Sequence, residues 1–202
     1  PEAERGISFG ADNRSLVYSS ERGGKRDLYI AKISRKEDLN FPNATLIEEE
    51  PLVPSKTLER DYPQFSPDGK VVAFIEDRNR LMVVNLDTKK IRQVTDGSTW
   101  YTRSGGFDYS WSPDGKWFTL EFIGNKHDPY SDIGLVSADG KGQIINLTNS
   151  GYTSGSPRWV MGGNAILFIT ERYGMRNHAS WGSLNDVMIA FLNQDAYDKF
   201  RL

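Results

Sequence analysis

The sequence predicts an all-β fold, a partial β-propeller of about four blades with four antiparallel strands each. The main observation is a string that occurs twice, at Phe65–Lys70 and Trp111–Lys116, in which an aromatic residue precedes Ser-Pro-Asp-Gly-Lys. Weaker versions of this frame begin at Phe9 and Trp159, so the four aromatic residues are spaced by 56, 46 and 48 residues. Such a period, filled with short strand-like runs, is typical of propeller blades.

The repeated string is predicted to form a tight turn after an inner strand. Proline presets its φ angle, aspartate accepts hydrogen bonds from the backbone ahead of it, and glycine supplies a positive φ. Gly69 and Gly115 occupy the position of positive φ, and Asn13 can replace glycine there in the first frame. The inner strands are therefore expected to end at the four aromatic residues, which are Phe9, Phe65, Trp111 and Trp159.

The remaining strands follow each turn in a fixed order. Second strands are predicted at 16–18, 71–75, 117–120 and 165–169, and third strands at 27–31, 80–84, 132–136 and 186–190. Fourth strands are weaker, at 91–95 and 143–148, with the weakest near 45–47. The last unit has no recognisable fourth strand, and residues 193–200 indicate a helix capped by Asn193 or Asp195.

These elements divide the chain into blades at approximately 1–56, 57–97, 98–149 and 150–202, the last incomplete. An arc of four blades leaves two open edges, which invite association, so we expect a parent propeller of six or seven blades. A compact four-bladed closure is the alternative. Residues 34–56 are predicted to form an exposed connector, because Glu48–Glu50 is a charge run beside Pro51 and Pro54.

Composition restricts the class of function. The chain has 202 residues, 38% of them hydrophobic, and 25 basic residues against 27 acidic ones. This balance argues against a nucleic-acid or anionic-membrane partner, since phosphate binding needs a clustered basic excess. No apolar run reaches the roughly 18 residues of a membrane helix. Without cysteine there is no disulfide, which fits either cytoplasm or periplasm.

Binding residues are predicted in the connections between second and third strands and between blades, on the face opposite the Ser-Pro-Asp-Gly turns. These segments are rich in aromatic and basic side chains, which commonly anchor peptides and proteins. The predicted binding residues are Trp100, Tyr101, Arg103, His127, Tyr130, Arg176, His178 and Trp181. The alternative interpretation is that these aromatic residues only cover the ends of the blades.

A search for catalytic residues gives none. His127 and His178 are the two histidines, and neither lies near a recognisable nucleophile motif. Residues 151–155 resemble a Gly-x-Ser-x-Gly elbow, but the serine falls one position late. A metal site formed by His127, Asp128 and Asp132 is conceivable on spacing, although turn chemistry explains the segment better. The sequence thus predicts no catalytic residue, no metal and no cofactor.

The repeats resemble a known family. The aromatic-Ser-Pro-Asp-Gly-Lys turns, the closing segments Val94–Gly97 and Leu147–Ser150, and the third strands that begin with Asp-Ile or Asp-Val are similar to the WD-like propeller repeats of TolB and of tricorn-type proteases. The resemblance covers almost the whole chain. Residues 111–125 and 151–193 are most similar to the N-terminal propeller of bacterial tricorn-like serine peptidases, in which a PDZ module and a catalytic core follow.

This resemblance implies a non-catalytic propeller module that binds or gates peptide substrates for a serine peptidase core outside this chain. Its partners would be a peptide or protein substrate and the catalytic and PDZ modules, and its location periplasmic or extracellular, with cytoplasmic as the alternative. One alternative function is a TolB-like periplasmic adaptor for a protein partner. A second is the propeller of a prolyl-oligopeptidase-type hydrolase, disfavoured because the sequence has no hydrolase elbow.

Overall fold

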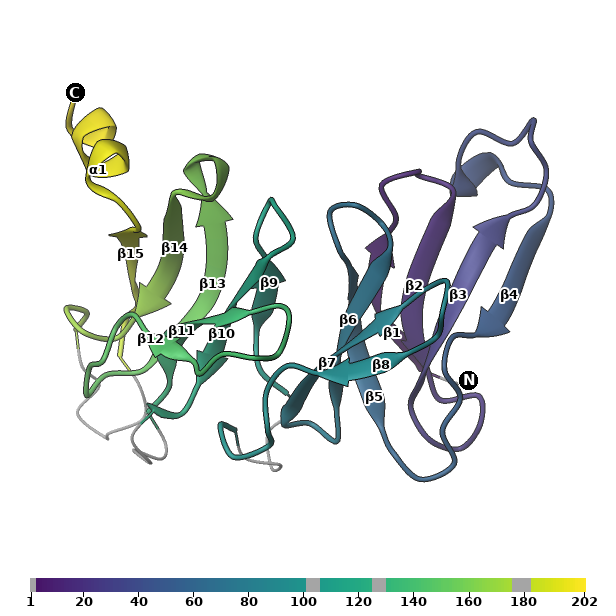
Figure 1. Ribbon diagram of the computed structural model, residues 1–202, viewed down its shortest axis with the longest axis horizontal. Coiled ribbons are helices and arrows are strands. Elements are labelled where there is room, and N and C mark those ends of the chain that lie inside the picture. Colours follow the sequence, from purple (N-terminus) through teal and green to yellow (C-terminus); the bar gives the residue numbers. More distant parts are fainter. Residues whose placement is uncertain (1–2, 101–105, 125–129, 176–182) are drawn as a thin grey trace. The chain divides into compact units, whose positions relative to one another are not determined.

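A computed structural model describes residues 3–100, 106–124, 130–175 and 183–202, which form two compact units, residues 1–106 and 107–202. The described residues are mainly β-strands in antiparallel sheets (Figure 1). This confirms the predicted all-β fold, with one blade per sheet and two blades per unit.

Unit 1 contains two four-stranded sheets, each with its strands in chain order. Blade one consists of β1 (Glu4–Phe9), β2 (Ser15–Ser20), β3 (Asp27–Ile33) and β4 (Ile47–Pro51). Blade two consists of β5 (Arg60–Phe65), β6 (Val71–Glu76), β7 (Arg80–Asn85) and β8 (Ile91–Gln93). Val17, Leu28, Val72 and Phe74 lie in one hydrophobic cluster and are completely buried, so the two blades share a core.

Unit 2 contains one four-stranded and one three-stranded sheet in its described part. Blade three consists of β9 (Tyr109–Trp111), β10 (Trp117–Phe122), β11 (Asp132–Ser137) and β12 (Ile145–Asn146). Blade four consists of β13 (Ser154–Val160), β14 (Ala165–Thr170) and β15 (Asp186–Phe191), followed by α1 (Gln194–Arg201). The Asn193 side chain accepts a hydrogen bond from the Ala196 amide, which confirms the predicted helix cap.

The turns have the predicted geometry. Gly69 and Gly115 both have φ of +69°, and Asn13 has φ of +53°. In the second blade the Ser66 hydroxyl donates to Asp68 Oδ1 at 2.6 Å and accepts from the Val71 amide at 3.0 Å. The third blade repeats this pattern through the corresponding serine and aspartate, at 2.6 and 2.9 Å. The serine hydroxyl therefore links the turn to the start of the second strand.

The first turn also joins the turn aspartate to the start of the second strand, but its serine lies on the strand instead of in the turn. Gly10 stands where the later turns have serine, and the Ser15 hydroxyl donates to Asp12 Oδ1 at 2.8 Å. Asp12 Oδ1 also accepts the Ser15 amide at 3.0 Å. A Cβ on Gly10 would lie only 2.5 Å from Ser15 Oγ, so the glycine makes room for the relocated hydroxyl.

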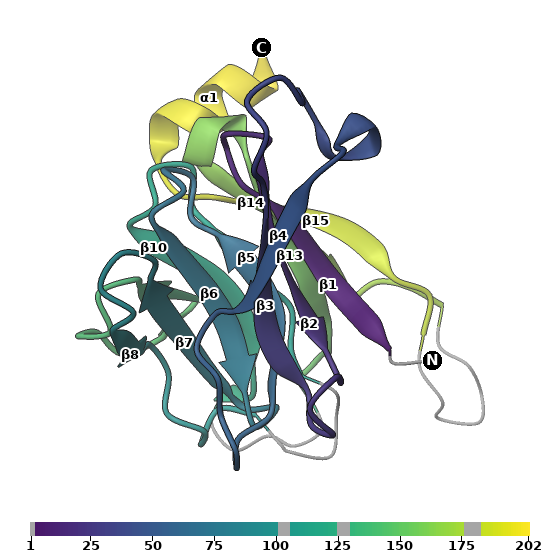
Figure 2. The same ribbon diagram turned by 90° about the vertical axis from the view of Figure 1, so that its right-hand side faces the viewer.

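The acidic part of residues 34–56 is exposed, as predicted, but it forms a strand rather than a connector, close to the weak fourth strand predicted near 45–47. Residues 47–51 form β4, which pairs with β3 along the sheet edge (Figure 2). All five residues are exposed, because an outer strand meets solvent on both faces. Glu49 accepts hydrogen bonds from Arg22 at 2.9 Å and from the Tyr18 hydroxyl at 3.0 Å, and burial with this bond raises the pKa of Tyr18.

Candidate functional site

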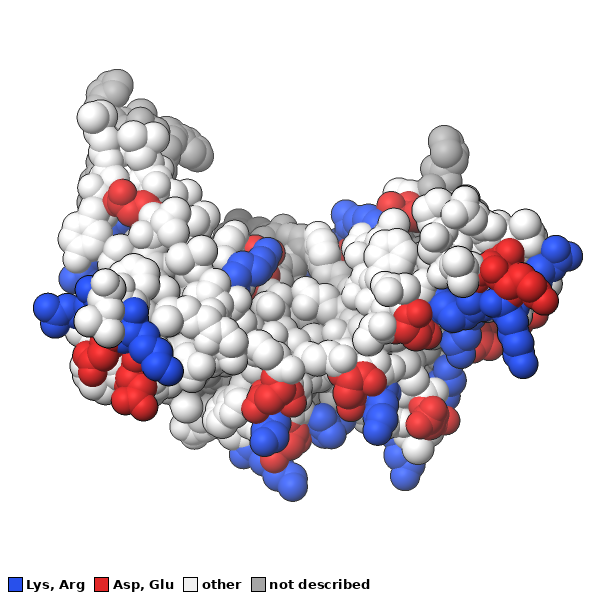
Figure 3. All heavy atoms as spheres, turned by 90° about the horizontal axis from the view of Figure 1, so that it is seen from above, with Lys and Arg blue, Asp and Glu red and all other residues white. Residues whose placement is uncertain are grey.

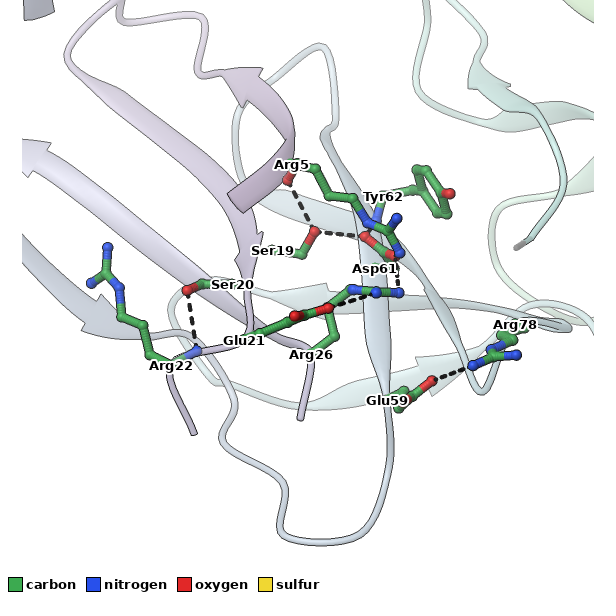
Figure 4. A network of polar contacts seen from close by, with 10 residues as sticks. All are labelled: Arg5, Ser19, Ser20, Glu21, Arg22, Arg26, Glu59, Asp61, Tyr62 and Arg78. Carbon is green, nitrogen blue, oxygen red and sulfur yellow. Dashed lines mark hydrogen bonds and ion pairs between the residues drawn. The ribbon is translucent and has the colours of Figure 1, made fainter. Parts of the chain in front are cut away.

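A network of polar contacts centred on the Asp61 carboxylate lies in unit 1, at the end where second and third strands connect (Figure 4). Asp61 Oδ2 accepts Arg5 at 2.5 Å and Arg26 at 2.9 Å, while its Oδ1 accepts the Ser19 hydroxyl at 2.6 Å. The Asp61 side chain is only 8% exposed. Since these partners come from β1, β2 and the β2–β3 connection, Asp61 fastens blade two to blade one. We assign it a structural role.

The inner strands β1, β5 and β13 share a backbone irregularity at this same end. Each has a break in pairing register, at Gly6, Tyr62 and Ser156, and each of these residues has a positive φ between 52° and 65°. All three stand three residues before the aromatic residue with which the repeated turn frame begins. Bulges of this kind redirect side chains. The Tyr62 ring consequently lies beneath the Arg5 guanidinium, with Arg5 Cζ 5.5 Å from the centroid of the ring.

A carboxylate accepts the amide of the bulge residue in each unit; Asp61 is buried and Glu121 is half-buried. Asp61 Oδ1 accepts the Tyr62 amide at 2.9 Å in unit 1. In unit 2, Glu121 on β10 accepts the Ser156 amide at 2.7 Å and the Asp108 amide at 3.3 Å. Burial raises the pKa of the Glu121 carboxyl. The N–H of the bulge residue is therefore bonded to a carboxylate of its own strand, β5, in unit 1 and to a carboxylate of another strand, β10, in unit 2.

Unit 2 exposes an apolar and cationic surface beside its second-to-third strand connections. The Arg172 guanidinium lies 5.2 Å from the Tyr173 ring centroid. Tyr173 is 64% exposed, Met175 75% and Leu184 63%. We call Arg172, Tyr173, Met175 and Leu184 the loop-end group. It follows β14 directly and precedes β15, so a paired hairpin holds both of its ends.

The predicted binding residue Tyr130 lies at the same end of unit 2. The Ser131 hydroxyl donates to the Ser154 carbonyl at 2.8 Å, and the Ser154 hydroxyl donates to Thr170 Oγ1 at 3.1 Å. These two contacts place the start of β11 beside the end of β14. Tyr130 is 45% exposed, so it can contact a ligand at this end.

Trp100 lies in unit 1 and is half-buried. Its connector is held near the β6–β7 turn, because the Asn79 amide donates to the Gly97 carbonyl at 3.2 Å. The other six predicted binding residues fall outside the described residues: Tyr101, Arg103, His127, Arg176, His178 and Trp181. Their convergence with Trp100 and Tyr130 into one rim stays a prediction.

Sequence reasoning missed the acidic residues at the bulges. One signal was available: Pro63 and Pro157 each stand two positions before the closing aromatic residue. Proline interrupts a strand ladder and is confined to edges and bulges, so this repeat marks the irregular position. Nothing comparable marks Asp61 or Glu121. Arg5, Ser19 and Arg26 lie 35 to 56 positions from Asp61, and Ser156 lies 35 positions from Glu121.

On the face seen in Figure 3, basic side chains lie beside acidic ones. In the described ranges, no group of three histidine, cysteine or acidic side chains has metal-site geometry. No helix in that part of the chain is long and apolar enough to cross a membrane. Both histidines lie outside the described residues, so their role stays untested.

Comparison with known proteins agrees with the propeller fold. No family model matches the sequence. The Tol-Pal system protein TolB of Francisella tularensis is 24% identical over 152 residues, which cover 72% of this chain and 31% of that protein. A putative tricorn-like protease C-terminal subunit of Sulfurisphaera tokodaii is 28% identical over 108 residues, 54% of this chain and 12% of that protein. The chain thus spans less than a third of either relative.

Solved structures show the same architecture. TolB from Acinetobacter baumannii matches 96% of this chain and 42% of its own with a TM-score of 0.66 and 20% identity. The tricorn protease matches 96% of this chain and 18% of its own with a TM-score of 0.65 and 14% identity. A prolyl endopeptidase matches 96% of this chain and 28% of its own with a TM-score of 0.61 and 18% identity.

The protein is therefore a β-propeller chain, and its four blades are part of a propeller. Its sequence relatives and structural neighbours together define it more closely as a TolB-like, tricorn-like β-propeller.

Proposed function

We propose that this chain is a non-catalytic propeller module of a tricorn-like serine peptidase, which binds or gates peptide substrates for a catalytic core outside the chain. The observation that carries the proposal is the loop-end group, whose tyrosine, methionine and leucine are each more than 60% exposed at the end of a paired hairpin. Exposed apolar side chains beside a cation on a rigid support mark an interaction site.

The chemistry of the loop-end group suits an extended polypeptide. A tyrosine ring and an arginine are frequent anchors of protein contacts. Methionine adapts its shape to different apolar partners, which fits a surface that accepts many sequences. The predicted binding residues would extend this surface within unit 2 and form a separate contact on unit 1. Those of unit 2 are His127, Tyr130, Arg176, His178 and Trp181, and those of unit 1 are Trp100, Tyr101 and Arg103.

A second candidate is a TolB-like adaptor that docks one protein partner. The similarity to TolB favours it, because that match covers 72% of the chain, whereas the tricorn-like match covers 54%. Both candidates use the same loop end and need no catalytic group in this chain. Under either, we propose a periplasmic or extracellular location.

Binding of unfolded casein to the purified chain tests the common part of the proposal. A double variant, Tyr173→Ser with Met175→Ser, should weaken binding at least about fivefold, because it removes roughly 1 kcal/mol of apolar contact. Leu39→Ser is the matched control, since Leu39 is 78% exposed at the β3–β4 connection and should leave binding unchanged. If the double variant and the Leu39→Ser control lost casein binding equally, or if neither lost any, the result would argue against a binding site at the loop end.

The two candidates separate in the full-length parent protein. A gating propeller predicts that the double variant changes the ratio of long-peptide to short-peptide cleavage, since only a long substrate reaches the loop end. An adaptor predicts no peptidase activity in the parent and saturable binding of one protein. An unchanged cleavage ratio in an active parent would reject the gating role.

A further inference from the structure

The third strand of blade four has an uncovered outer edge. In the other three blades a fourth strand pairs with that edge, but β15 pairs only with β14 among the described strands. The second residue of each third strand shows the consequence. Leu28, Leu81 and Ile133 are completely buried, whereas Val187 is 66% exposed. Blade four therefore presents open backbone groups next to an exposed valine.

The complete blades show how this edge is closed. After each fourth strand, the amide of an apolar residue donates to the carbonyl of that second residue. The pairs are Leu52 with Leu28 at 2.9 Å, Val94 with Leu81 at 2.8 Å, and Leu147 with Ile133 at 2.8 Å. In blades two and three a threonine follows, and its hydroxyl accepts the amide of Leu81 or Ile133, at 2.9 and 3.1 Å.

An aspartate completes the closure in blade three. Asp132 Oδ1 accepts the Thr148 hydroxyl at 2.5 Å and the Ser150 amide at 3.0 Å, and its Oδ2 accepts the Asn146 side chain at 2.9 Å. Asp27 in blade one accepts the Ser55 amide at 2.7 Å in the same way. These aspartates hold the segment that leaves the fourth strand.

Asp186 occupies the same position in blade four. It pairs with Thr170, the last residue of its second strand, just as Asp132 pairs with Phe122. Yet Asp186 Oδ2 is buried and has no hydrogen-bond partner in the described structure. A buried carboxylate oxygen is normally hydrogen-bonded, so an unpartnered one points to a missing donor.

We propose that the outer edge of β15 binds an extended polypeptide strand that carries an apolar residue followed by threonine, as in Leu147-Thr148. The apolar amide donates to the Val187 carbonyl, the threonine hydroxyl accepts the Val187 amide, and the same hydroxyl donates to Asp186. Strand addition of this kind takes affinity from the backbone and selectivity from side chains. A second copy of β15 does not supply this pattern, because residues 186–191 contain no threonine.

A peptide with the sequence of Gln143–Ser150, blocked at both ends and fluorescently labelled, is the probe. Fluorescence anisotropy with the full chain should show saturable binding. A peptide with Thr148→Val should bind about tenfold more weakly, the effect of one charged hydrogen bond, and Thr148→Ser should restore most of the affinity. Asp186→Ala in the protein should weaken the original peptide about tenfold and Asp186→Asn much less, because the amide keeps an acceptor oxygen.

Val187→Pro tests the backbone contact. It removes the outward N–H without touching the bonds to β14, so peptide binding should be lost while circular dichroism stays unchanged. Hydrogen exchange should show new protection at Val187 and Ile189 when the peptide is bound. Should the proline variant unfold, Asp186→Ala and the two threonine peptides decide alone.

Three outcomes would overturn the proposal. One is the absence of saturable binding. Another is equal binding by wild type, Asp186→Ala and Val187→Pro, which would mean that the peptide pairs elsewhere, for example in place of β12. The third is a dimer in sedimentation experiments that Val187→Pro abolishes and the peptide does not displace, which would make a second copy the occupant.

Discussion

The turn hydroxyl that links the first and second strands can be moved by design. In blade two the hydroxyl belongs to Ser66, whereas in blade one it belongs to Ser15, five positions after Gly10. Val71 is the residue of blade two that corresponds to Ser15. The double variant Ser66→Gly with Val71→Ser should therefore convert the second turn into the first.

The magnitudes follow from the contacts. Ser66→Gly removes a hydrogen bond to a carboxylate and the acceptor of the Val71 amide, which costs about 2–4 kcal/mol. Val71→Ser alone removes half-buried methyl groups at about 1–2 kcal/mol. It also places a hydroxyl against the Ser66 side chain, since the equivalent Cβ at Gly10 would lie 2.5 Å from Ser15 Oγ. The double variant avoids both the lost acceptor and the crowding, so its cost should be lower than the sum of the single costs by at least about 1.5 kcal/mol.

Urea titrations of the wild type and the three variants, followed by circular dichroism, give the coupling energy. Hydrogen exchange of unit 1 amides assigns the change to that unit. A matched pair in blade three, Ser112→Gly with Trp117→Ser, should behave differently because a large side chain is lost. Single costs that add to within about 0.5 kcal/mol would refute the reasoning that one hydroxyl position substitutes for the other.

Three other predictions concern stability and its pH dependence. Gly69→Val should cost about 1–3 kcal/mol because a β-branched residue is strained at positive φ, and Gly163→Val should cost at least as much, since Gly163 has φ of +94° and its Cβ would lie 3.3 Å from a proline ring carbon. Denaturant titration measures both costs, and a Gly69→Val or Gly163→Val variant as stable as the wild type would contradict the argument. Asp61→Ala should cost about 2 kcal/mol or more because it removes the carboxylate that two arginines and a buried serine share, although Arg26 keeps Glu21 and Ser19 keeps the Arg5 carbonyl. The exposed-pair control Arg78→Ala should cost less than about 0.5 kcal/mol, and similar losses in the two variants would contradict this reasoning. Burial raises the pKa of Glu121 in the folded state, so its contribution to stability is full below about pH 4 and is lost as pH rises through the folded pKa; Glu121→Gln should remove this component, and parallel pH profiles would contradict it.

The strands and turns were predictable because their determinants are local. Proline, aspartate and glycine define the turn within six residues, and apolar runs mark the buried second and third strands. The structure revises the fourth turn, where the sequence suggested a degenerate version of the frame. Met161, Gly162 and Gly163 all have positive φ there, so this turn also depends on its glycines.

The outer strand and the blade junctions could not be predicted in the same way. β4 has no buried face, so its acidic residues carry no strand periodicity, and only pairing with β3 defines it. Tyr62 and Ser156 adopt positive φ although neither is glycine, and a carboxylate accepts the amide of each: the adjacent Asp61 for Tyr62, and Glu121, 35 positions away, for Ser156. Of the predicted binding residues, Trp100 and Tyr130 lie in the connections that the repeat pattern assigned to them, and their convergence into one rim stays a prediction.

The blades keep their backbone donors in place while the acceptors change position in the sequence. The amide that starts the second strand is accepted by the Ser66 hydroxyl in blade two and by the Asp12 carboxylate in blade one. The bulge amide is accepted by Asp61 from its own strand or by Glu121 from the preceding blade. The fold requires each buried polar group to be paired, whichever residue supplies the partner. The same requirement applies to the open edge of blade four. Asp186 retains the acceptor that the other blades use to hold a fourth strand, so the edge is built to be covered by a donor that the described structure does not contain.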